Sequence, residues 1–232
     1  MEEPKTYHLP TPLRKEDVAR LRTGDLVYLT GRVHTMRDAG YERTLQRLDA
    51  GQPLPFTLTD GVIWHCGPIT RKQGKRWRIV SAGSTTSSRF TAPAATLIER
   101  LGVRAVMGKG VMGKETVEAM RRYTAAYLVT TGGAGAYYAQ KIKEIEKVYW
   151  LDLGMPAAVW VFHVEEFGPL LVGIDAQGQS LHDALTAQVR ENIRKVYADL
   201  RIDQSRRYTW WPRRVMGTPW HRDPPPRIET HI

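Results

Sequence analysis

Short apolar runs alternate with amphipathic segments along most of this chain. The apolar runs that predict strands are residues 26–33, 62–66, 77–80, 103–107, 125–130, 159–164 and 170–174. The segments with helical spacing of apolar residues are 15–21, 38–48, 92–101, 114–122, 134–143 and 179–200. This alternation predicts an α/β fold, and the close spacing of the first strands predicts antiparallel neighbours within a mixed sheet.

The chain changes character after residue 204. The runs Trp-Trp-Pro, Gly-Thr-Pro-Trp and Pro-Pro-Pro follow one another between residues 210 and 226. Proline lacks the amide hydrogen that a helix needs, so these runs cannot continue one. We therefore predict one domain over residues 1–204, beginning with an N-terminal arm, and an irregular, extended tail over residues 205–232.

The composition is that of a globular protein without disulfides. Hydrophobic residues make up 42% of the 232 residues, and a chain of this length buries about 70% of its unfolded surface. Cys66 is the single cysteine, so no disulfide can form within the chain, and a reducing cytoplasm is the expected compartment. The N-terminus lacks the pattern of a signal peptide, and no apolar run reaches the ~18 residues of a membrane span, so no membrane association is expected.

The chain is basic, with a formal net charge of +10. Residues 205–232 hold six arginines against Asp223 and Glu229, and the rest of the excess charge is spread over sequence of mixed sign. No block of five or six consecutive basic residues occurs, so nucleic-acid binding is not expected. The charge remains compatible with an anionic substrate or an acidic partner protein.

Four segments combine glycine or small polar residues with the end of a predicted strand. They are residues 35–39, 83–89, 107–112 and 131–136. Ligands of α/β proteins bind at the carboxyl ends of the strands. These four segments are therefore the candidate binding site.

The second and third segments carry residues suited to binding an anion. The hydroxyls of Thr85 and Thr86 precede a predicted helix, and Arg89 adds a planar fork that matches a carboxylate. Lys109 lies between two glycines, which let the backbone approach a ligand closely. From the residues alone, the alternatives are a plain helix cap with a solvated arginine and a turn with an exposed lysine.

The other two segments and the histidines have simpler interpretations. Asp38 could cap the following helix while Arg37 pairs with a neighbour, and the glycine pair 132–133 could be a tight turn. One cysteine and seven scattered histidines give no zinc-type ligand spacing, and no Ser-His-Asp arrangement can be nominated. We therefore interpret His34 and His65 as structural residues, and expect no metal ligands in this chain.

Taken together and in order, six segments resemble the β subunit, or C-terminal domain, of class I fumarase and L-tartrate dehydratase. The matching segments are LxxGDLVYLTGRVHTMRDAGYER, GVIWHCGP, GSTTSSRF, MGKGVM, TGGAGAYYA and FGPLLVGIDAQG. Each segment is weak alone, but six in register are specific, and together they span about residues 20–178. The resemblance does not cover the chain beyond about residue 200.

The resemblance implies a swivelling β/β/α three-layer domain and a hydro-lyase activity. The implied reaction is the reversible hydration of fumarate to L-malate, with dehydration of L-tartrate or another hydroxy-dicarboxylate as the alternative. It also implies a [4Fe–4S] cluster held by three cysteines of a partner α subunit, since Cys66 alone cannot provide the ligands. Activity is therefore expected only with that α subunit, in an α₂β₂ assembly.

The resemblance also implies roles for matching positions of this sequence. Arg37 and Arg89 resemble the arginines that clamp the dicarboxylate, and Lys109 resembles the lysine that contacts its carboxylate. Thr85 resembles the threonine proposed as the catalytic base. A threonine hydroxyl is a very weak base, so the neighbouring cations would have to stabilise its alkoxide character.

Two further residues and three departures from the family pattern adjoin these positions. Asp38 is a candidate for orienting an arginine or relaying a proton, and Thr86 for binding the substrate. The family usually has histidine at Tyr41, proline at Ser84 and methionine at Phe90, so the substrate preference could differ. A non-catalytic binding or assembly module is the competing interpretation, but a scaffold has no need of the retained base and cations.

Overall fold

The structure, a computed structural model, describes residues 3–74 and 76–202. Its elements in chain order are β1 (Thr6–Thr11), α1 (Lys15–Ala19), β2 (Leu26–Thr35), α2 (Asp38–Asp49), β3 (Val62–Trp64), β4 (Cys66–Gln73), β5 (Arg76–Ser84), η1 (Ser87–Phe90), α3 (Thr91–Leu101), β6 (Ala105–Gly108), α4 (Lys114–Tyr123), β7 (Ala126–Val129), α5 (Gly135–Lys141), β8 (Ile142–Tyr149), η2 (Leu151–Leu153), β9 (Val159–Ile174) and α6 (Leu181–Asp199). Residues 1–182 form one compact unit and residues 183–232 a second, so each is described by itself. The predicted tail, 205–232, lies outside the described residues, and its boundary stays a prediction.

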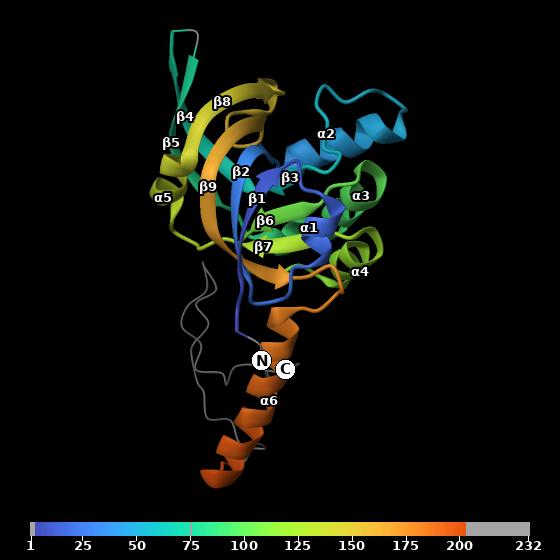
Figure 1. Cartoon of the computed structure of the whole chain (residues 1–232), viewed down its shortest axis with the longest axis vertical. Coiled ribbons are helices and arrows are strands. Elements are labelled where there is room, and N and C mark those ends of the chain that lie inside the picture. The colour runs from blue at the N-terminus through green and yellow to red at the C-terminus, as the bar shows by residue number, and fades with distance from the viewer. Residues whose placement is uncertain (1–2, 75, 203–232) are drawn as a thin grey trace, which may run out of the picture. The chain divides into compact units, whose positions relative to one another are not determined.

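The main sheet closes on itself. Its seven strands pair in the order β1-β2-β3-β6-β7-β9-β8, and an additional pairing joins β2 to β9. Strands β1, β2, β3, β6 and β7 run parallel to their neighbours in this order, whereas β9 is antiparallel to β2, β7 and β8. Because β2 pairs with both β3 and β9, and β9 with both β2 and β7, these five strands form a ring (Figure 1).

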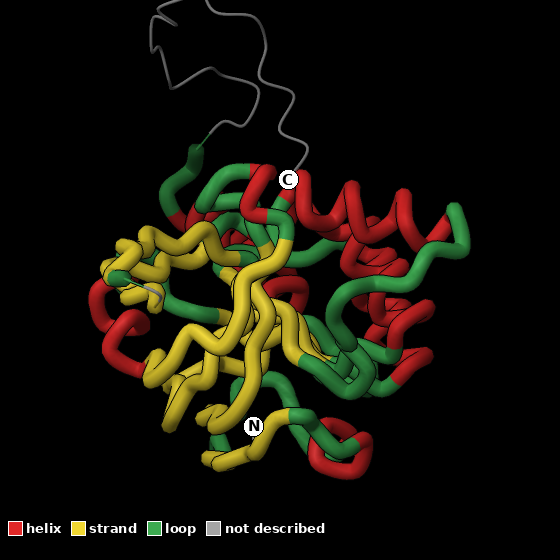
Figure 2. The backbone as a smooth tube through the Cα atoms, turned by 90° about the horizontal axis from the view of Figure 1, so that it is seen from above, coloured by secondary structure: helices red, strands yellow, loops and turns green. Residues whose placement is uncertain are grey.

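Two buried clusters lie on opposite faces of the parallel strands. Val62 and Trp64 of β3 belong to one cluster and Ile63 to the other, which is the alternation that a strand imposes. The first cluster packs against the β4–β5 hairpin, and the second holds the apolar faces of α2, α3 and α4. Figure 1 shows these three helices on one side and the hairpin, α5 and β8 on the other, and Figure 2 shows the strands gathered at the centre with helices outside them. The expected α/β fold with a mixed sheet is confirmed.

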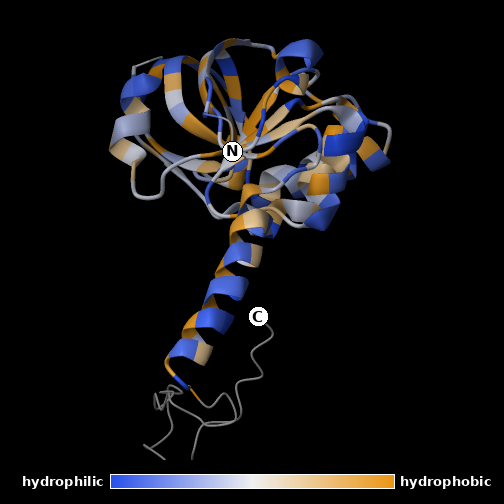
Figure 3. Cartoon of the chain, turned by 60° about the horizontal axis from the view of Figure 1, so that its bottom comes forward, coloured by the Kyte–Doolittle hydropathy of each residue, from blue (hydrophilic) through white to orange (hydrophobic). Residues whose placement is uncertain are grey.

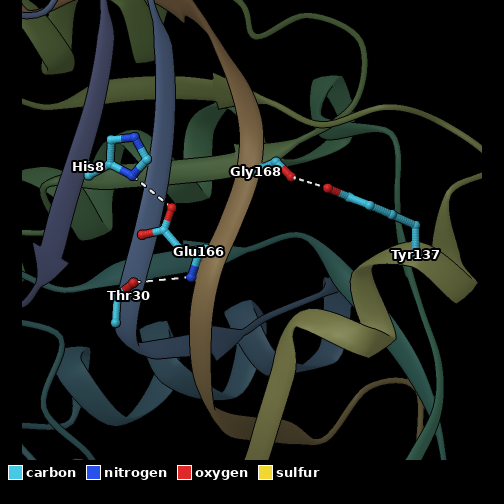
Figure 4. Close-up of polar contacts among 5 residues, drawn as sticks. All are labelled: His8, Thr30, Tyr137, Glu166 and Gly168. Atoms are coloured by element: carbon cyan, nitrogen blue, oxygen red, sulfur yellow. Dashed lines mark hydrogen bonds and ion pairs between the residues drawn. The ribbon is translucent and has the colours of Figure 1, made fainter.

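A bulge in β9 is fastened from three sides (Figure 4). Glu166, at a left-handed φ of 46°, donates its backbone N–H to the Thr30 hydroxyl at 3.1 Å. Its carboxylate Oε2 is 2.7 Å from His8 Nδ1. Two residues further on, the Tyr137 hydroxyl donates to the Gly168 carbonyl at 2.7 Å. Contacts from β1, β2 and α5 therefore hold the irregular backbone of β9 in place.

The hydrophobic pattern missed β1 and β8 and divided β9 into two strands. In β1 only Leu9 is buried, so this edge strand has no apolar alternation to reveal it. The predicted helix 134–143 ends at Lys141, and β8 follows it. In β8 the apolar residues Ile142, Ile145 and Val148 are three apart, which imitates a helix, because two register shifts interrupt its pairing with β9. The strands predicted at 159–164 and 170–174 are one strand, which the bulge bends without ending it.

The predicted strand 62–66 divides at His65. β3 ends before this residue, and β4 begins after it and pairs with β5 in a separate two-stranded sheet. The basic loop predicted at 70–75 and the strand predicted at 77–80 are both parts of this longer hairpin. Both ends of the hairpin therefore leave from the carboxyl edge of the main sheet.

The helix predicted at 179–200 is α6. It has no buried residue among those described, and its exposed apolar residues Leu185, Val189 and Val196 recur at helical spacing. Hydrophobic and hydrophilic bands accordingly alternate along it in Figure 3. Within the described ranges, no helix is both long and apolar enough to cross a membrane.

The contact between β1 and β2 yields a prediction for stability. Gly31 has a φ of +124°, and a Cβ there would lie 2.6 Å from the Thr11 carbonyl oxygen, whereas Gly24, at φ +95°, has nothing within 4 Å. Alanine is strained at both positions, so Gly24→Ala is the matched control for backbone strain. We expect Gly31→Ala to lower the free energy of unfolding by about 1–3 kcal/mol more than Gly24→Ala. Urea titrations of both variants measure this difference. Equal losses of unfolding free energy would mean that β1 moves away from the new methyl group at no cost.

Candidate functional site

The candidate segments meet at one edge of the sheet. Residues 35–39 lie at the end of β2, residues 107–112 at the end of β6, and residues 131–136 after β7. These three strands and β3 are parallel, in the order β2-β3-β6-β7. The remaining segment, 83–89, lies at the end of β5. Carboxyl ends of parallel strands face the same way, so the expected convergence of the four segments is present in the fold.

Backbone hydrogen bonds attach the threonine segment to this edge. The Thr85 N–H donates to the His65 carbonyl at 2.7 Å, and the Ser87 N–H donates to the Lys109 carbonyl at 2.9 Å. Thr86 and Lys109 form an isolated parallel bridge. Thr85, Thr86 and Lys109 therefore lie on adjacent, paired backbone, although Thr86 and Lys109 are 23 positions apart in sequence.

Arg37 is held at the start of α2 with unused hydrogen-bond donors. It occupies the N-cap position in extended conformation, and its guanidinium packs across Gly67, where a Cβ would lie 2.5 Å from Nη1. Its Nε is buried and has no hydrogen-bond partner among the described residues. The charged contact that it makes is with Asp38, at 3.8 Å. A planar donor group kept in place but unsatisfied is suited to receive an oxyanion.

Asp38 lies between two arginines. Its carboxylate is 3.8 Å from Arg37 and 3.4 Å from Arg89, and the Asp38 and Arg89 side chains are about half exposed. Arg89 also stacks over the Phe90 ring, with its guanidinium carbon 5.0 Å from the ring centre. The N-cap position of α2 belongs to Arg37, so Asp38 is the first residue of the helix and pairs the two arginines.

The threonine hydroxyls and the lysine ammonium have no partners within the described part of the chain. No hydrogen bond or ion pair occupies the side chains of Thr85, Thr86 or Lys109 there. The stem of Lys109 passes Gly132, where a Cβ would lie 3.6 Å from its Cδ. Gly110 has a φ of +78°, which favours glycine directly after the lysine.

These side chains together favour a doubly negative ligand. We call Arg37, Arg89 and Lys109 the cationic edge. Asp38 offsets one of its three positive charges, which leaves two, and two charges match a dicarboxylate. The threonine hydroxyls beside Lys109 add donors and acceptors to the same place.

His65 is the residue whose importance the sequence did not indicate. It is fully buried and lies between Tyr41, whose hydroxyl is 2.7 Å from His65 Nε2, and Ser87, whose hydroxyl is 2.9 Å from His65 Nδ1. Burial lowers the pKa of His65 to about 3, with the nearby Arg89 charge acting in the same direction, so the ring is neutral. The structural role expected for His65 fits this position. No spacing in the sequence links residues 41, 65 and 87.

Of the three positions expected to depart from the family pattern, Tyr41 and Phe90 pack on His65, and Ser84 bonds to Trp64 and Thr130. Tyr41 and Phe90 are buried and stack on each other, with ring centres 5.4 Å apart, and the Phe90 ring is 4.6 Å from His65. Ser84 accepts a hydrogen bond from Trp64 Nε1 at 2.7 Å and a second from the Thr130 hydroxyl at 2.6 Å. A proline at position 84 could accept neither bond at its side chain.

The residues of this chain do not fit an iron–sulfur cluster by themselves. Such clusters are held by several cysteine thiolates. Cys66 is the single cysteine, it is buried, and burial raises the pKa of its thiol. No group of three or more potential metal-ligating side chains occurs in the described ranges.

One family model matches most of the chain. The family described as Fumarase C-terminus matches residues 1–185. The chain belongs to this family. The matched residues include the whole cationic edge, Asp38 and both threonines, so the relationship expected from the six motifs is confirmed.

Named relatives cover most of this fumarase C-terminus chain. The L(+)-tartrate dehydratase subunit beta of Escherichia coli is 40% identical over 193 residues, which are 83% of this chain and 90% of that protein. The putative L(+)-tartrate dehydratase subunit beta of Methanocaldococcus jannaschii is 38% identical over 185 residues, 79% of this chain and 95% of that protein. The putative fumarate hydratase class I of Geobacillus stearothermophilus is 35% identical over 192 residues, 82% of this chain but 36% of that protein.

The two buried histidines of this fumarase C-terminus domain predict a pH dependence of stability. Burial lowers the pKa of His65 to about 3 and that of His34 to about 4, against about 6.5 in an unfolded chain. The unfolded state therefore binds more protons below about pH 6.5, so stability is full above that pH and is lost as the pH falls toward 4 and then 3.

Urea unfolding between about pH 7 and about pH 5 isolates this effect, because most carboxyl groups titrate at lower pH. We expect the free energy of unfolding to fall, with a slope approaching about 2.7 kcal/mol per pH unit for two histidines. A flat profile over this interval would contradict the neutral, buried state of both rings.

Proposed function

We propose that this chain is the β-type subunit of a hydro-lyase that acts on a hydroxy-dicarboxylate at the cationic edge. The observation that carries the proposal is the convergence of three cations and two threonine hydroxyls with unused hydrogen-bonding groups at the carboxyl edge of the sheet. The membership of the Fumarase C-terminus family supports the reaction class. A purely structural module would not leave these groups unsatisfied at one place.

In the proposed complex, the arginines bind the substrate carboxylates. Arg37 is immobilised against Gly67 and its Nε is already desolvated, so little of its freedom remains to be lost on binding. Arg89 is more exposed and is oriented by Asp38 and by the Phe90 ring. One fixed and one adjustable guanidinium can receive the two ends of a diacid.

We assign proton transfer to the Thr85 hydroxyl and carboxylate binding to Lys109, with Thr86 beside it. A threonine hydroxyl becomes a useful base only where positive charge stabilises its deprotonated form. The bridge between Thr86 and Lys109 keeps that lysine beside the threonines. Removal of the α-proton adds negative charge to a dianion, and cations fixed in advance stabilise that state more than the ground state. Asp38 would orient the arginines or relay the proton.

A partner α subunit is part of the proposal. The relatives of E. coli and M. jannaschii are named as β subunits, and this chain spans nearly their whole length. The relative of G. stearothermophilus is much longer than the matched region. The proposed partner would hold the [4Fe–4S] cluster, in an α₂β₂ assembly, because this chain lacks the thiolates for one.

For the substrate we rank L-tartrate first and fumarate with L-malate second. The motif resemblance alone favours fumarate. The relatives named for tartrate are 38–40% identical and similar in length to this chain, against 35% for the relative named for fumarate. Steady-state assays of the reconstituted pair on L-tartrate, L-malate and fumarate test this ranking.

Replacement of Lys109 tests the cationic edge. Lys109→Met keeps the aliphatic stem along Gly132 and removes the charge, so we expect kcat/KM to fall about tenfold to a hundredfold, the value of a lost charged hydrogen bond. Lys114→Met is the matched control, since Lys114 is exposed at the start of α4. Equal kinetics in the two variants would remove Lys109 from the site.

Separation of the subunits tests the partner requirement. We expect the purified chain alone to be colourless and inactive, because it lacks cluster ligands, and activity to appear on addition of an α-type subunit loaded with iron and sulfide. The same samples are measured for turnover and for the visible absorbance of an iron–sulfur cluster. An active, cluster-free preparation of this chain alone would refute the two-subunit proposal.

A further inference from the structure

Behind the cationic edge, a chain of hydrogen bonds runs through buried side chains. The Tyr41 hydroxyl, on α2, is 2.7 Å from His65 Nε2, and His65 Nδ1 is 2.9 Å from the Ser87 hydroxyl. The backbone of Ser87 continues this link, because its N–H donates to the Lys109 carbonyl at 2.9 Å. Tyr41, His65 and Ser87 therefore link α2, the threonine segment and the turn after β6.

The backbone of His65 joins the same parts of the site. Its N–H donates to the Met107 carbonyl at 2.8 Å, and its carbonyl accepts from the Thr85 N–H at 2.7 Å. The space around the ring is tight, since a Cβ at Gly108 would lie 2.0 Å from the Ser87 hydroxyl and 3.2 Å from His65 Nδ1. Small displacements of this ring would therefore be transmitted to the residues on either side.

The buried donors determine the direction of the chain. If His65 carries its proton on Nδ1, Tyr41 donates to Nε2 and His65 donates to the Ser87 hydroxyl, so the Tyr41 and His65 donors are both satisfied. If the proton lies on Nε2, the Tyr41 hydroxyl loses its only acceptor within the described residues, in a site where that side chain is buried. An unsatisfied buried hydroxyl is costly, so the Nδ1–H form is favoured.

We propose that Tyr41, His65 and Ser87 are positioning residues, which hold the threonine segment and the lysine turn in register through a one-directional hydrogen-bond chain. Its kinetic consequence rests on the proposed function. Thr85 and Ser87 lie on the segment that His65 fixes, and the Lys109 carbonyl accepts from the Ser87 N–H, so loss of this hydrogen-bond chain displaces the proposed base relative to the cations. Displacements of about 1 Å in such groups cost turnover rather than folding.

The first test is the tautomer of His65, measured by ¹⁵N NMR on the full-length chain. We expect the proton on Nδ1, with Nε2 as the acceptor. An Nε2–H tautomer would overturn the proposed direction. This measurement needs neither a substrate nor the α subunit.

The second test is Tyr41→Phe, which removes one hydroxyl and keeps the ring stack with Phe90. Thr44→Val is the matched control, because Thr44 is buried on the same helix and its hydroxyl donates to the Gly40 carbonyl, which is not part of the hydrogen-bond chain through His65. We expect Tyr41→Phe to accelerate hydrogen exchange at the Thr85 and Ser87 amides, and Thr44→Val to leave it unchanged. Equal exchange in both variants would overturn the proposal.

The third test measures turnover of the reconstituted pair. We expect Tyr41→Phe and Ser87→Ala each to lower kcat about tenfold with little change in KM, because the binding cations remain. The double variant should lose little more than either single variant, since both break one chain. If Tyr41→Phe and Thr44→Val have the same kcat, the hydrogen-bond chain has no effect on turnover and the kinetic part of the proposal is wrong. An inactive wild-type pair would refute the proposed function, and the tautomer and exchange results would still decide the positioning role.

Discussion

The antiparallel pairing of β2 with β9 is the interaction on which the rest of the structure depends. It runs from Leu26 opposite Leu171 to His34 opposite Val161, whereas only His34 and Thr35 of β2 pair with β3. Arg37 follows β2 after Met36, whose N–H donates to the Trp64 carbonyl of β3 at 2.9 Å, so the pairings of β2 with β9 and with β3 together hold its position. Because β9 also pairs with β7, the same strand borders the parallel strands β2, β3, β6 and β7 on both sides. Closure of the ring thus brings Arg37 to the edge that carries Lys109.

The sequence could predict those elements whose burial follows a regular period. β2, β6 and β7 are apolar, and α2, α3 and α4 have one apolar face, so their existence and order were predictable. β1 and β8 escaped because an edge strand needs little burial and because register shifts place the apolar residues of β8 three apart. The closure through β9 was unpredictable for another reason. Pairing partners are set by tertiary packing, and Glu165 and Glu166 interrupt the apolar run that would have shown one strand.

The site was predictable to the extent that it follows from strand ends. Arg37, Asp38, Thr85, Arg89 and Lys109 were found because polar residues after apolar strands are conspicuous, and their motifs supplied possible roles. The hydrogen-bond chain behind them was not, because Tyr41, His65 and Ser87 belong to three distant segments that only the fold brings together. Side chains that act through packing leave no spacing in the sequence. The roles of the exposed residues remain proposals, while their placement follows from the fold.

The location of the family departures bears on how one scaffold could serve different diacids. Tyr41 and Phe90 are 2% and 1% exposed, so neither can contact a substrate. Both contact His65, and Phe90 also supports the Arg89 guanidinium. Any influence on substrate preference must therefore pass through the backbone of the threonine segment and the orientation of Arg89. On the proposed function, charge would select a dicarboxylate at the cationic edge, and the packing behind that edge would set the spacing at which its two carboxylates are received.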